Sequence, residues 1–245
     1  MIKFNKEQIY IVTGASSGIG ETTAILLNEL GATVVGIGRN QERLEGMKAK
    51  CKYPENMFLE QKDLTEDIEG LPKYVKSLKE KYGKFSGMAY CAGIGSLNPI
   101  RSIDFEEISN VFNINYFAPI FMMKGIVDKR NNVGEGFSAV LIASIGALTC
   151  APSMTSYSGS KGALISSIKV IAKEIATRGM RANTVSPALI ETKMADETSR
   201  DYAEGKYPFG LGKTSDVANV IAFLLSSDAR WINAQNYIID CGSEI

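Results

Sequence analysis

The chain contains no histidine among its 245 residues, so the commonest catalytic side chain is missing. This absence excludes a Ser-His-Asp triad, a Cys-His pair and every histidine-ligated metal site. Acid-base chemistry near neutral pH must then come from a tyrosine, a lysine or a carboxylate with a shifted pKa. Cysteine is also scarce, and Cys51, Cys91, Cys150 and Cys241 form no C-x-x-C pair, so we predict neither a metal site nor a disulfide framework.

The sequence also lacks an excess of either charge and any long apolar run. The 27 Lys and Arg residues balance 27 Asp and Glu residues, which gives no electrostatic reason to expect a nucleic-acid or membrane partner. No apolar run reaches the roughly 18 residues of a membrane span, and residues 1–14 lack the apolar stretch of a signal peptide. We therefore expect a cytoplasmic protein. No repeat, linker or low-complexity tract marks a boundary, so we predict a single domain over residues 1–245.

Apolar runs of strand length alternate with longer segments of helical period along the chain. The predicted strands cover residues 8–13, 33–37, 56–61, 85–91, 138–144, 181–185 and 236–240. The predicted helices cover residues 18–30, 41–51, 67–82, 104–127, 157–178 and 214–225. The runs TVVGI and AVLIAS are apolar on both faces, as strands are in a parallel sheet covered by helices on each side. The fold class is therefore α/β, a doubly wound parallel sheet of the Rossmann type with about seven strands.

The first predicted strand leads directly into a glycine-rich turn, TGASSGIG, that opens the first helix. Gly14, Gly18 and Gly20 give the spacing G-x-x-x-G-x-G, a variant of the dinucleotide-binding fingerprint. Glycines allow the backbone to approach a pyrophosphate closely, and the free N–H groups of a helix N-terminus favour its negative charge. Such a turn can also be a simple tight connection, but its place at the first strand-to-helix junction favours the phosphate site.

The end of the second predicted strand bears on which nicotinamide cofactor is used. An acidic residue there would bind a ribose 2′-hydroxyl, but the chain has Arg39 and no carboxylate between Ile37 and Asn40. A guanidinium suits a 2′-phosphate, so we predict that NADP(H) is preferred and that NAD(H) is possible. The alternative is that Arg39 is a solvated loop residue.

Tyr157 and Lys161 lie four residues apart near the start of a predicted helix, so their side chains share one helical face. A cation beside a phenol favours phenolate and lowers a tyrosine pKa that is about 10 in free solution. Ser144 ends the fifth predicted strand, at the carboxyl edge of the sheet, and can lie near Tyr157. Each motif alone is also compatible with ordinary packing, and their combination predicts a proton-transferring site.

Taken together, these residues resemble the short-chain dehydrogenase/reductase family over essentially the whole chain. The matching positions, in the order of the family's motifs, are Gly14, Gly18 and Gly20, Asp63, Ala92 with Gly93, Asn115, Ser144, Tyr157 with Lys161, and Pro187, Ile190 and Thr192. The resemblance implies an NAD(P)-dependent oxidoreductase that transfers a hydride between nicotinamide and a carbonyl or alcohol carbon.

The resemblance also implies a role for each member of a tetrad. Tyr157 would be the general acid or base, and Ser144 would donate a hydrogen bond to the substrate oxygen. Lys161 would hold the nicotinamide ribose and lower the pKa of Tyr157. Asn115 would anchor a water that connects Lys161 to solvent.

Similar positions in the family imply the remaining cofactor contacts. The glycine turn would surround the diphosphate, and the backbone after the fourth strand would follow the ribose. Residues after the third strand would contact the adenine. Residues after the sixth strand would contact the carboxamide and the diphosphate. These cofactor-binding residues are Gly14, Ser16, Ser17, Gly18, Ile19, Gly20, Arg39, Asp63, Leu64, Cys91, Ala92, Gly93, Tyr157, Lys161, Pro187, Ile190 and Thr192.

The sequence departs from the family's pattern at three places. Tyr90-Cys91-Ala92-Gly93 stands where the family usually has Asn-Asn-Ala-Gly, so a thiol replaces an amide that braces the central sheet. Ala188 replaces a usual glycine, and Cys241 stands where a second glycine is frequent. Family members of this size imply a homo-oligomer, a tetramer or dimer, packed through the fourth and fifth predicted helices.

Two alternatives to an active enzyme of this family remain at this stage. One is a catalytically silent nicotinamide-binding sensor or regulator of the same fold. The other is a doubly wound methyltransferase or other nucleotide-binding enzyme in which Tyr157 and Lys161 are incidental. The substrate is open among a 3-oxoacyl thioester, a keto-sugar and a cyclic ketone. Residues 188–212 are the predicted substrate lid, and an apolar pocket beneath it would use Met154, Met194, Tyr202 and Phe209 unless these residues serve only packing.

Overall fold

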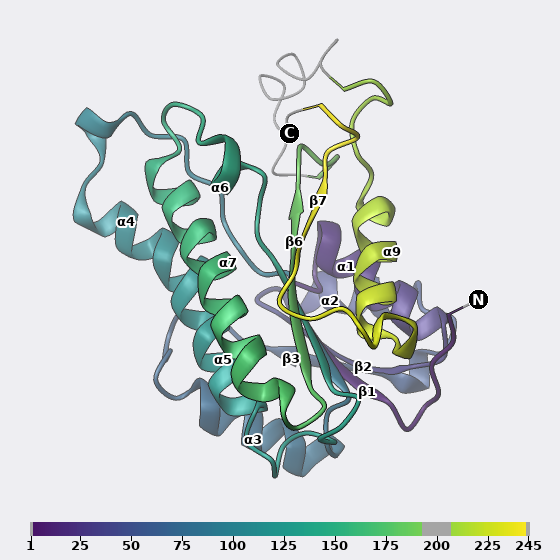
Figure 1. The fold of residues 1–245 in the computed structure, drawn as a ribbon. Helices are drawn as coiled ribbons and strands as arrows, with labels where there is room; N and C mark the ends of the chain where they lie inside the picture. Colours follow the sequence, from purple (N-terminus) through teal and green to yellow (C-terminus); the bar gives the residue numbers. More distant parts are fainter. Residues whose placement is uncertain (1, 193–206, 244–245) are drawn as a thin grey trace.

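Seven parallel strands form one sheet in the computed structural model, which describes residues 2–192 and 207–243 (Figure 1). The strands are β1 (Ile9–Thr13), β2 (Thr33–Gly38), β3 (Met57–Gln61), β4 (Gly87–Tyr90), β5 (Ser138–Ile142), β6 (Arg181–Pro187) and β7 (Asn236–Ile239). Their order is β3-β2-β1-β4-β5-β6-β7. The chain leaves β1 toward one edge and returns at β4 toward the other, so the order reverses between β1 and β4. This confirms the predicted doubly wound sheet.

Helices cover both faces of the sheet. The helices α1 (Gly18–Glu29), α2 (Gln41–Lys48) and α9 (Thr214–Leu225) lie on one face, and α3 (Leu71–Tyr82), α4 (Phe105–Phe112), α5 (Ala118–Ile126) and α7 (Thr155–Ala176) lie on the other (Figure 1). Shorter elements connect them: α6 (Gly146–Thr149), the 3-10 turns η1 (Pro54–Asn56), η2 (Ile100–Ser102) and η4 (Ser227–Ala229), and the π-helical turn η3 (Asn113–Phe117). Among the helices of residues 2–192 and 207–243, none is long and apolar enough to cross a membrane.

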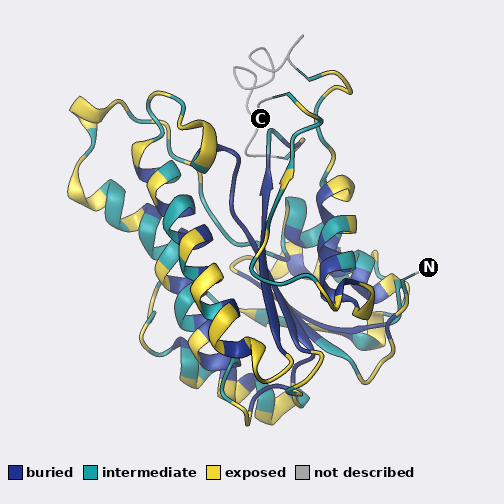
Figure 2. Cartoon of the chain, viewed as in Figure 1, coloured by how far each residue is buried: buried dark blue, intermediate teal, exposed yellow. Residues whose placement is uncertain are grey.

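The two layers of core explain the apolar character of the strands. Every residue of β2, β4, β5 and β6 is buried, as Figure 2 shows for the centre of the sheet. One apolar cluster packs between the sheet and α3, α5 and α7, and the second packs between the sheet and α1, α2 and α9. The strands therefore bury side chains on both faces, as the apolar runs of β2 and β5 predicted, whereas β6 also buries the polar residues Arg181, Asn183, Thr184 and Ser186.

The helix predicted over residues 104–127 is not a regular α-helix. It consists of α4, the π-helical turn η3 and α5 in succession, and the N–H of Ala118 donates to the carbonyl of Asn113. Pro119 explains the change of register, because it has no N–H to donate to the carbonyl of Asn115 four residues earlier. The sequence interpretation missed this turn, which contains one of the predicted tetrad residues.

Two other helix starts differ from the prediction. The third helix begins at Leu71 instead of residue 67, because Pro72 occupies its first turn and Asp67 accepts a hydrogen bond from the Gly70 N–H at 2.9 Å in a separate preceding turn. Helix α7 begins at Thr155, two residues earlier than predicted. Tyr157 therefore lies inside the first turn of a helix rather than at its boundary.

Candidate functional site

The glycine turn after β1 is shaped by close backbone contacts that only glycine permits. Gly14 has φ +69°, and a Cβ at this position would lie 3.0 Å from the backbone nitrogen of Ala92. A Cβ at Gly20 would lie 2.3 Å from the carbonyl oxygen of Gly14. The turn thus packs directly on the segment after β4, at the point where the strand order reverses.

The N-terminus of α1 is left open by this turn. Ser17 is the N-cap, but its side chain makes no capping hydrogen bond within the described part of the chain. The N–H groups of Gly18, Ile19 and Gly20 precede the first intrahelical donors and are directed out of the helix end. They provide positive potential for an anion, and the predicted phosphate-binding residues are thereby brought together.

A cavity of about 860 Å³ adjoins this helix end. Its lining combines the turn, the α2 side and the segment after β6: Ser16, Ser17, Gly18, Glu21, Arg43, Gly46, Lys50, Glu191, Thr192 and Leu211. Thr192 lies against the turn, since its Cγ2 would be 3.3 Å from a Cβ at Gly18. Of this lining, the sequence prediction contained only Ser16, Ser17, Gly18 and Thr192 as site residues.

Thr13 is a site residue that the sequence interpretation missed. Its buried hydroxyl oxygen accepts hydrogen bonds from the backbone N–H groups of Cys91 and Ala92, both at 3.1 Å. This side chain ties the end of β1 to the segment after β4. Burial raises the pKa of the Cys91 thiol to about 12, against smaller lowering effects from Thr23 and Lys161, so Cys91 is a neutral packing group here.

Arg39 lies at the end of β2, as predicted, but it has a partner that the sequence did not indicate. Its Nη1 is 3.7 Å from Oδ2 of Asp63, and its side chain is 73% exposed. Partial burial favours the neutral form of Asp63, but hydrogen bonds from Thr65 and the charge of Arg39 outweigh it and lower the pKa of Asp63. The guanidinium is therefore already paired with a carboxylate, although a surface pair of this length is weak.

Two further cations line the cavity beside the turn. Lys50 is paired with Glu21 at 2.7 Å, whereas Arg43 has no ion pair among the described residues. Arg43 lies in the first turn of α2, four residues beyond Arg39. Arg43 was not among the predicted cofactor-binding residues, because that prediction rested on residues 37–40 at the end of the second strand.

Ser144 and Tyr157 meet at the carboxyl edge of β5. A Cβ at Gly146 would lie 3.3 Å from Oγ of Ser144 and 3.6 Å from Cε1 of Tyr157. Burial raises the pKa of Tyr157, and a hydrogen bond with Ser144 lowers it by less, so the phenol keeps its proton near neutral pH. Ser144 Oγ also accepts a hydrogen bond from the Gly146 N–H at 3.0 Å.

Lys161 is buried, with 4% of its surface exposed, and its Nζ donates to the carbonyl of Ile142 at 2.8 Å. Burial lowers its pKa from 10.5 to about 8. Burial raises the pKa of Tyr157, whereas the sequence predicted that Lys161 would lower it; the ammonium of Lys161 is directed to a backbone carbonyl. Lys161 and Asn115 flank Gly93, where a Cβ would lie 3.3 Å from Nζ and 2.9 Å from Oδ1.

Asn115 connects three elements of the site. Its side-chain oxygen accepts from the Ile94 N–H at 3.0 Å, and its Nδ2 donates to the Ile94 carbonyl at 2.9 Å and to Ser160 Oγ at 3.2 Å. The four predicted tetrad residues therefore lie around the same edge of the sheet. Asn115 holds the segment after β4 against α7.

The remaining predicted residues differ in how closely they approach this site. Leu64 and Ile190 are buried in the core, and the Pro187 carbonyl accepts from the Ile145 N–H at 3.0 Å. The methyl group of Met154 lies beside Gly146 with Ser144 and Tyr157, whereas Phe209 is 87% exposed. Met194 and Tyr202 lie outside the described residues.

Comparison with known proteins adds a second line of evidence. Residues 14–244 match the family model described as enoyl-(acyl carrier protein) reductase. The chain is 31% identical over 248 residues to 3-oxoacyl-(acyl-carrier-protein) reductase FabG of Thermotoga maritima, across 96% of this chain and 97% of that one. It is 30% identical over 240 residues to cyclohexanol dehydrogenase of an Acinetobacter species, across 97% and 95% of the two chains.

A solved structure agrees over the full length of the fold. It is a short-chain dehydrogenase/reductase, of the glucose/ribitol dehydrogenase type, from Brucella melitensis. The TM-score is 0.92 at 27% sequence identity, and the match covers 100% of both chains. The similarity therefore includes the sheet, the helices on both faces and the segments at the carboxyl edge.

The Thr13 hydroxyl is expected to stabilise the folded state, since it is the acceptor for two backbone donors. Thr13→Val keeps the shape but leaves the Cys91 and Ala92 N–H groups without this acceptor, and should lower the free energy of unfolding by about 2 kcal/mol or more. Urea unfolding measures this loss. Thr13→Ser retains the oxygen and is the matched control; equal stability of the Val and Ser variants would contradict the assigned bonds.

The buried Lys161 should make stability depend on alkaline pH. Below pH 8 it is charged in both the folded and unfolded chains, so the full cost of burying the charge is present. Between about pH 8 and 10.5 the unfolded chain binds more protons, and the free energy of unfolding rises with pH, by about 3 kcal/mol in total for this group. Urea unfolding of the native chain and Lys161→Met across this range isolates the effect.

The exposed Lys173 on the same helix provides the control, because its removal should leave the pH dependence unchanged. Parallel stability curves for the native chain and Lys161→Met would show that the ammonium group is solvated, in conflict with the buried position.

Proposed function

The chain belongs to the short-chain dehydrogenase/reductase family of NAD(P)-dependent oxidoreductases, and from this membership we propose an NADP(H)-dependent enzyme that interconverts a carbonyl and an alcohol, with Tyr157 as general acid or base. The membership sets aside the methyltransferase alternative. The observation that carries the proposal is the meeting of Ser144 and Tyr157 beside buried Lys161, at the edge where the glycine turn opens.

The residues around the glycine turn fit a dinucleotide. The turn of Gly14, Gly18 and Gly20 has no room for Cβ atoms at its closest contacts, and the N–H groups at the start of α1 suit a diphosphate. When bound, the nicotinamide supplies or accepts the hydride. Asp63, Gly93 and Thr192 lie along the carboxyl edge in positions that suit the adenosine, the ribose and the diphosphate.

Proton transfer would be the task of the tetrad. The raised pKa of Tyr157 keeps its phenol protonated near neutral pH, as a general acid must be when a carbonyl is reduced. Ser144 would donate a hydrogen bond to the substrate oxygen and offset its developing charge. Lys161, with a pKa near 8, would hold the ribose, and a water anchored by Asn115 would connect Lys161 to solvent for proton exchange.

A preference for the phosphorylated cofactor is supported by two guanidinium groups near the turn. Arg39 is exposed at the end of β2 and weakly paired with Asp63, and Arg43 lines the cavity beside Ser16 and Ser17 without an ion pair among the described residues. A 2′-phosphate between them would receive charge-assisted hydrogen bonds. No carboxylate of the β2 end competes for that position, since the segment after β2 reads Arg39-Asn40.

The segment of residues 188–212, of which residues 193–206 lie outside the described part of the chain, is proposed as the substrate lid. Its described ends pair with one another: the Glu191 N–H donates to the Gly212 carbonyl at 2.8 Å, and Ile190 packs on Gly212. Met154 lies at the site, and two of the relatives are named for a 3-oxoacyl-(acyl-carrier-protein) and for cyclohexanol. The proposed substrate class is therefore a carbonyl compound with an apolar part.

Self-association through α4, α5 and α7 is also proposed. These helices and the turn η3 leave large apolar side chains in solvent, including Phe105 at 84% exposure together with Phe117 and Val170. A second copy of the chain would cover them, in agreement with the homo-oligomer expected from the sequence.

Tyr157→Phe tests the catalytic role directly. It removes the proton donor without removing the ring, so kcat should fall by about 10² to 10⁴-fold while the NADPH-induced rise in melting temperature persists. NADPH absorbance with acetoacetyl-CoA, cyclohexanone and a keto-sugar provides the assay. Unchanged turnover in this variant would overturn the proposed mechanism.

Tyr74→Phe is the matched control for loss of a buried hydroxyl. The Tyr74 hydroxyl has no hydrogen-bond partner among residues 2–192 and 207–243, so its removal should leave kcat intact. If the native chain binds NADPH but reduces none of these carbonyl compounds, the sensor alternative is favoured.

The cofactor preference is tested with Arg39→Ala and Arg43→Ala. Each should weaken NADPH binding by about 10- to 100-fold, the value of a charge-assisted hydrogen bond, and leave NADH binding within about twofold. Isothermal titration calorimetry with NADPH and with NADH gives the ratio of the two dissociation constants for each variant. Arg230→Ala, at an exposed position directly after η4, is the control; equal losses for NADPH and NADH would remove the 2′-phosphate assignment.

A further inference from the structure

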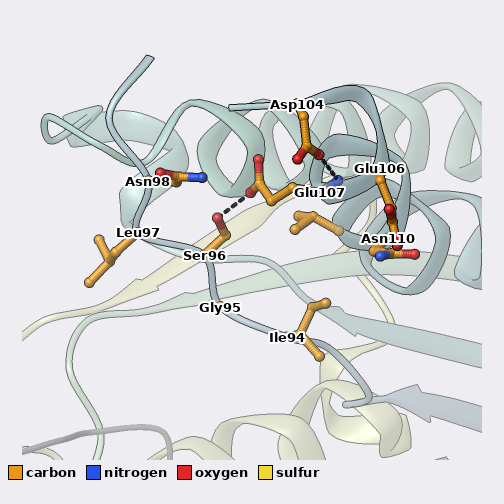
Figure 3. A pocket seen from close by; sticks show the side chains of 10 residues that line it. Ile94, Gly95, Ser96, Leu97, Asn98, Asp104, Glu106, Glu107 and Asn110 are labelled. Atoms are coloured by element: carbon orange, nitrogen blue, oxygen red, sulfur yellow. Dashed lines mark hydrogen bonds between the residues drawn. The ribbon is translucent and has the colours of Figure 1, made fainter. Parts of the chain in front are cut away.

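The loop that follows β4 is fixed at three alternate residues, each bonded to a different element. Ile94 is bonded to Asn115 of η3, Ser96 Oγ donates to Glu107 of α4, and the Asn98 N–H donates to the Ser153 carbonyl at 2.7 Å. Figure 3 shows the Glu107 carboxylate turned toward Ser96, at the edge of a cavity of about 440 Å³. The loop therefore depends on α4 and on the segment before α7 for its position.

Two of these bonds are each the first half of a link between the loop and α7, because Asn115 and Glu107 each bond the loop on one side and a serine of α7 on the other. In the first, the Asn115 side chain joins Ile94 to Ser160 Oγ, and Ser160 Oγ donates to the Tyr157 carbonyl at 2.7 Å. In the second, Glu107 joins Ser96 to Ser156: one carboxylate oxygen accepts from each hydroxyl, with Ser156 at 3.0 Å. Tyr157 lies between the two α7 ends of these links.

The second link is built from groups with few other partners. Ser156 is buried and Glu107 is partly buried, so the hydrogen bond that the Ser156 hydroxyl donates to the carboxylate is charge-assisted and directed. Both Glu107 oxygens are used, one on each side. Removing the carboxylate would take one anchor from both the loop and the first turn of α7, whereas removing either serine would take an anchor from only one of them.

We propose that Glu107 is a positioning residue for Tyr157, because its carboxylate joins the loop of residues 94–98 to the turn that carries the phenol. This inference rests on the proposed role of Tyr157. Glu107 itself contacts neither the phenol nor the glycine turn in the structure described. It acts through Ser156, the residue that precedes Tyr157.

The matched control is Glu106, the preceding residue in the same helical turn. Glu106 is exposed and has no ion pair or side-chain hydrogen bond among the described residues, so Glu106→Ala removes the same charge without breaking the link. Glu107→Gln is the conservative variant, since an amide can accept from one serine and donate to the other. Ser156→Ala removes only the α7 end of the link.

Glu107→Ala should lower kcat by about 10- to 100-fold, as expected for a small displacement of a catalytic group, with NADPH affinity unchanged within about twofold. Glu107→Gln should recover most of the loss, and Glu106→Ala should match the native chain. Ser156→Ala should lower kcat in the native chain but add no further loss in Glu107→Ala, because both changes break the same link.

Hydrogen–deuterium exchange of the protein without cofactor gives a readout that needs no substrate. Glu107→Ala should speed exchange at residues 94–98 and 155–160 relative to Glu106→Ala, and Glu107→Gln should restore protection. Equal exchange and equal kcat in the two alanine variants would overturn the inference. A loss of NADPH affinity and melting temperature that glutamine does not restore would also overturn it, in favour of a general structural role.

Tyr157→Phe in the same series separates this inference from the proposed function. If that variant turns over at the native rate, the proposed function fails whatever Glu107 does. If it is inactive while Glu107→Ala equals Glu106→Ala in kcat and exchange, only the positioning role of Glu107 is lost.

Discussion

The reversal of strand order between β1 and β4 is the constraint on which the site depends. Connections from these neighbouring strands leave toward opposite faces of the sheet, so their carboxyl ends separate and the backbone there faces a crevice instead of a covering loop. The Thr13 hydroxyl limits the separation of the β1 and β4 ends, because its oxygen accepts hydrogen bonds from the Cys91 and Ala92 N–H groups after β4. Glycine at position 14 then allows the turn to pack on Ala92.

Burial supplies the acid-base chemistry that a chain without histidine needs. At the same edge of the sheet, burial favours the neutral forms of both titratable side chains: the pKa of Lys161 falls to about 8 and that of Tyr157 rises. The lysine therefore titrates near physiological pH, while the phenol remains a proton donor. The Ile142 carbonyl holds the ammonium in place, so its position does not depend on a partner carboxylate.

The sequence predicted what is repetitive and local, and missed what depends on a single contact across the fold. The seven strands follow from apolar runs, and the glycine turn from its spacing, because these patterns are independent of distant residues. The Arg39–Asp63 pair joins the ends of β2 and β3, so no local pattern marks it. The pKa of Tyr157 was expected to fall because helical spacing shows that Lys161 is near, but spacing does not show that the phenol is buried, which raises this pKa.

Pro119 was present in the sequence, yet its consequence for the site needed the structure. In a regular α-helix, two residues eight positions apart differ in direction by about 80°, so Glu107 and Asn115 would not both face α7 and the loop after β4. The π-helical turn that begins at Asn113 takes up an extra residue and reduces this difference. Because Pro119 cannot donate to Asn115, the wide turn is the favourable local structure. Glu107 of α4 and Asn115 of η3 thereby each reach both the loop after β4 and helix α7, on either side of Tyr157.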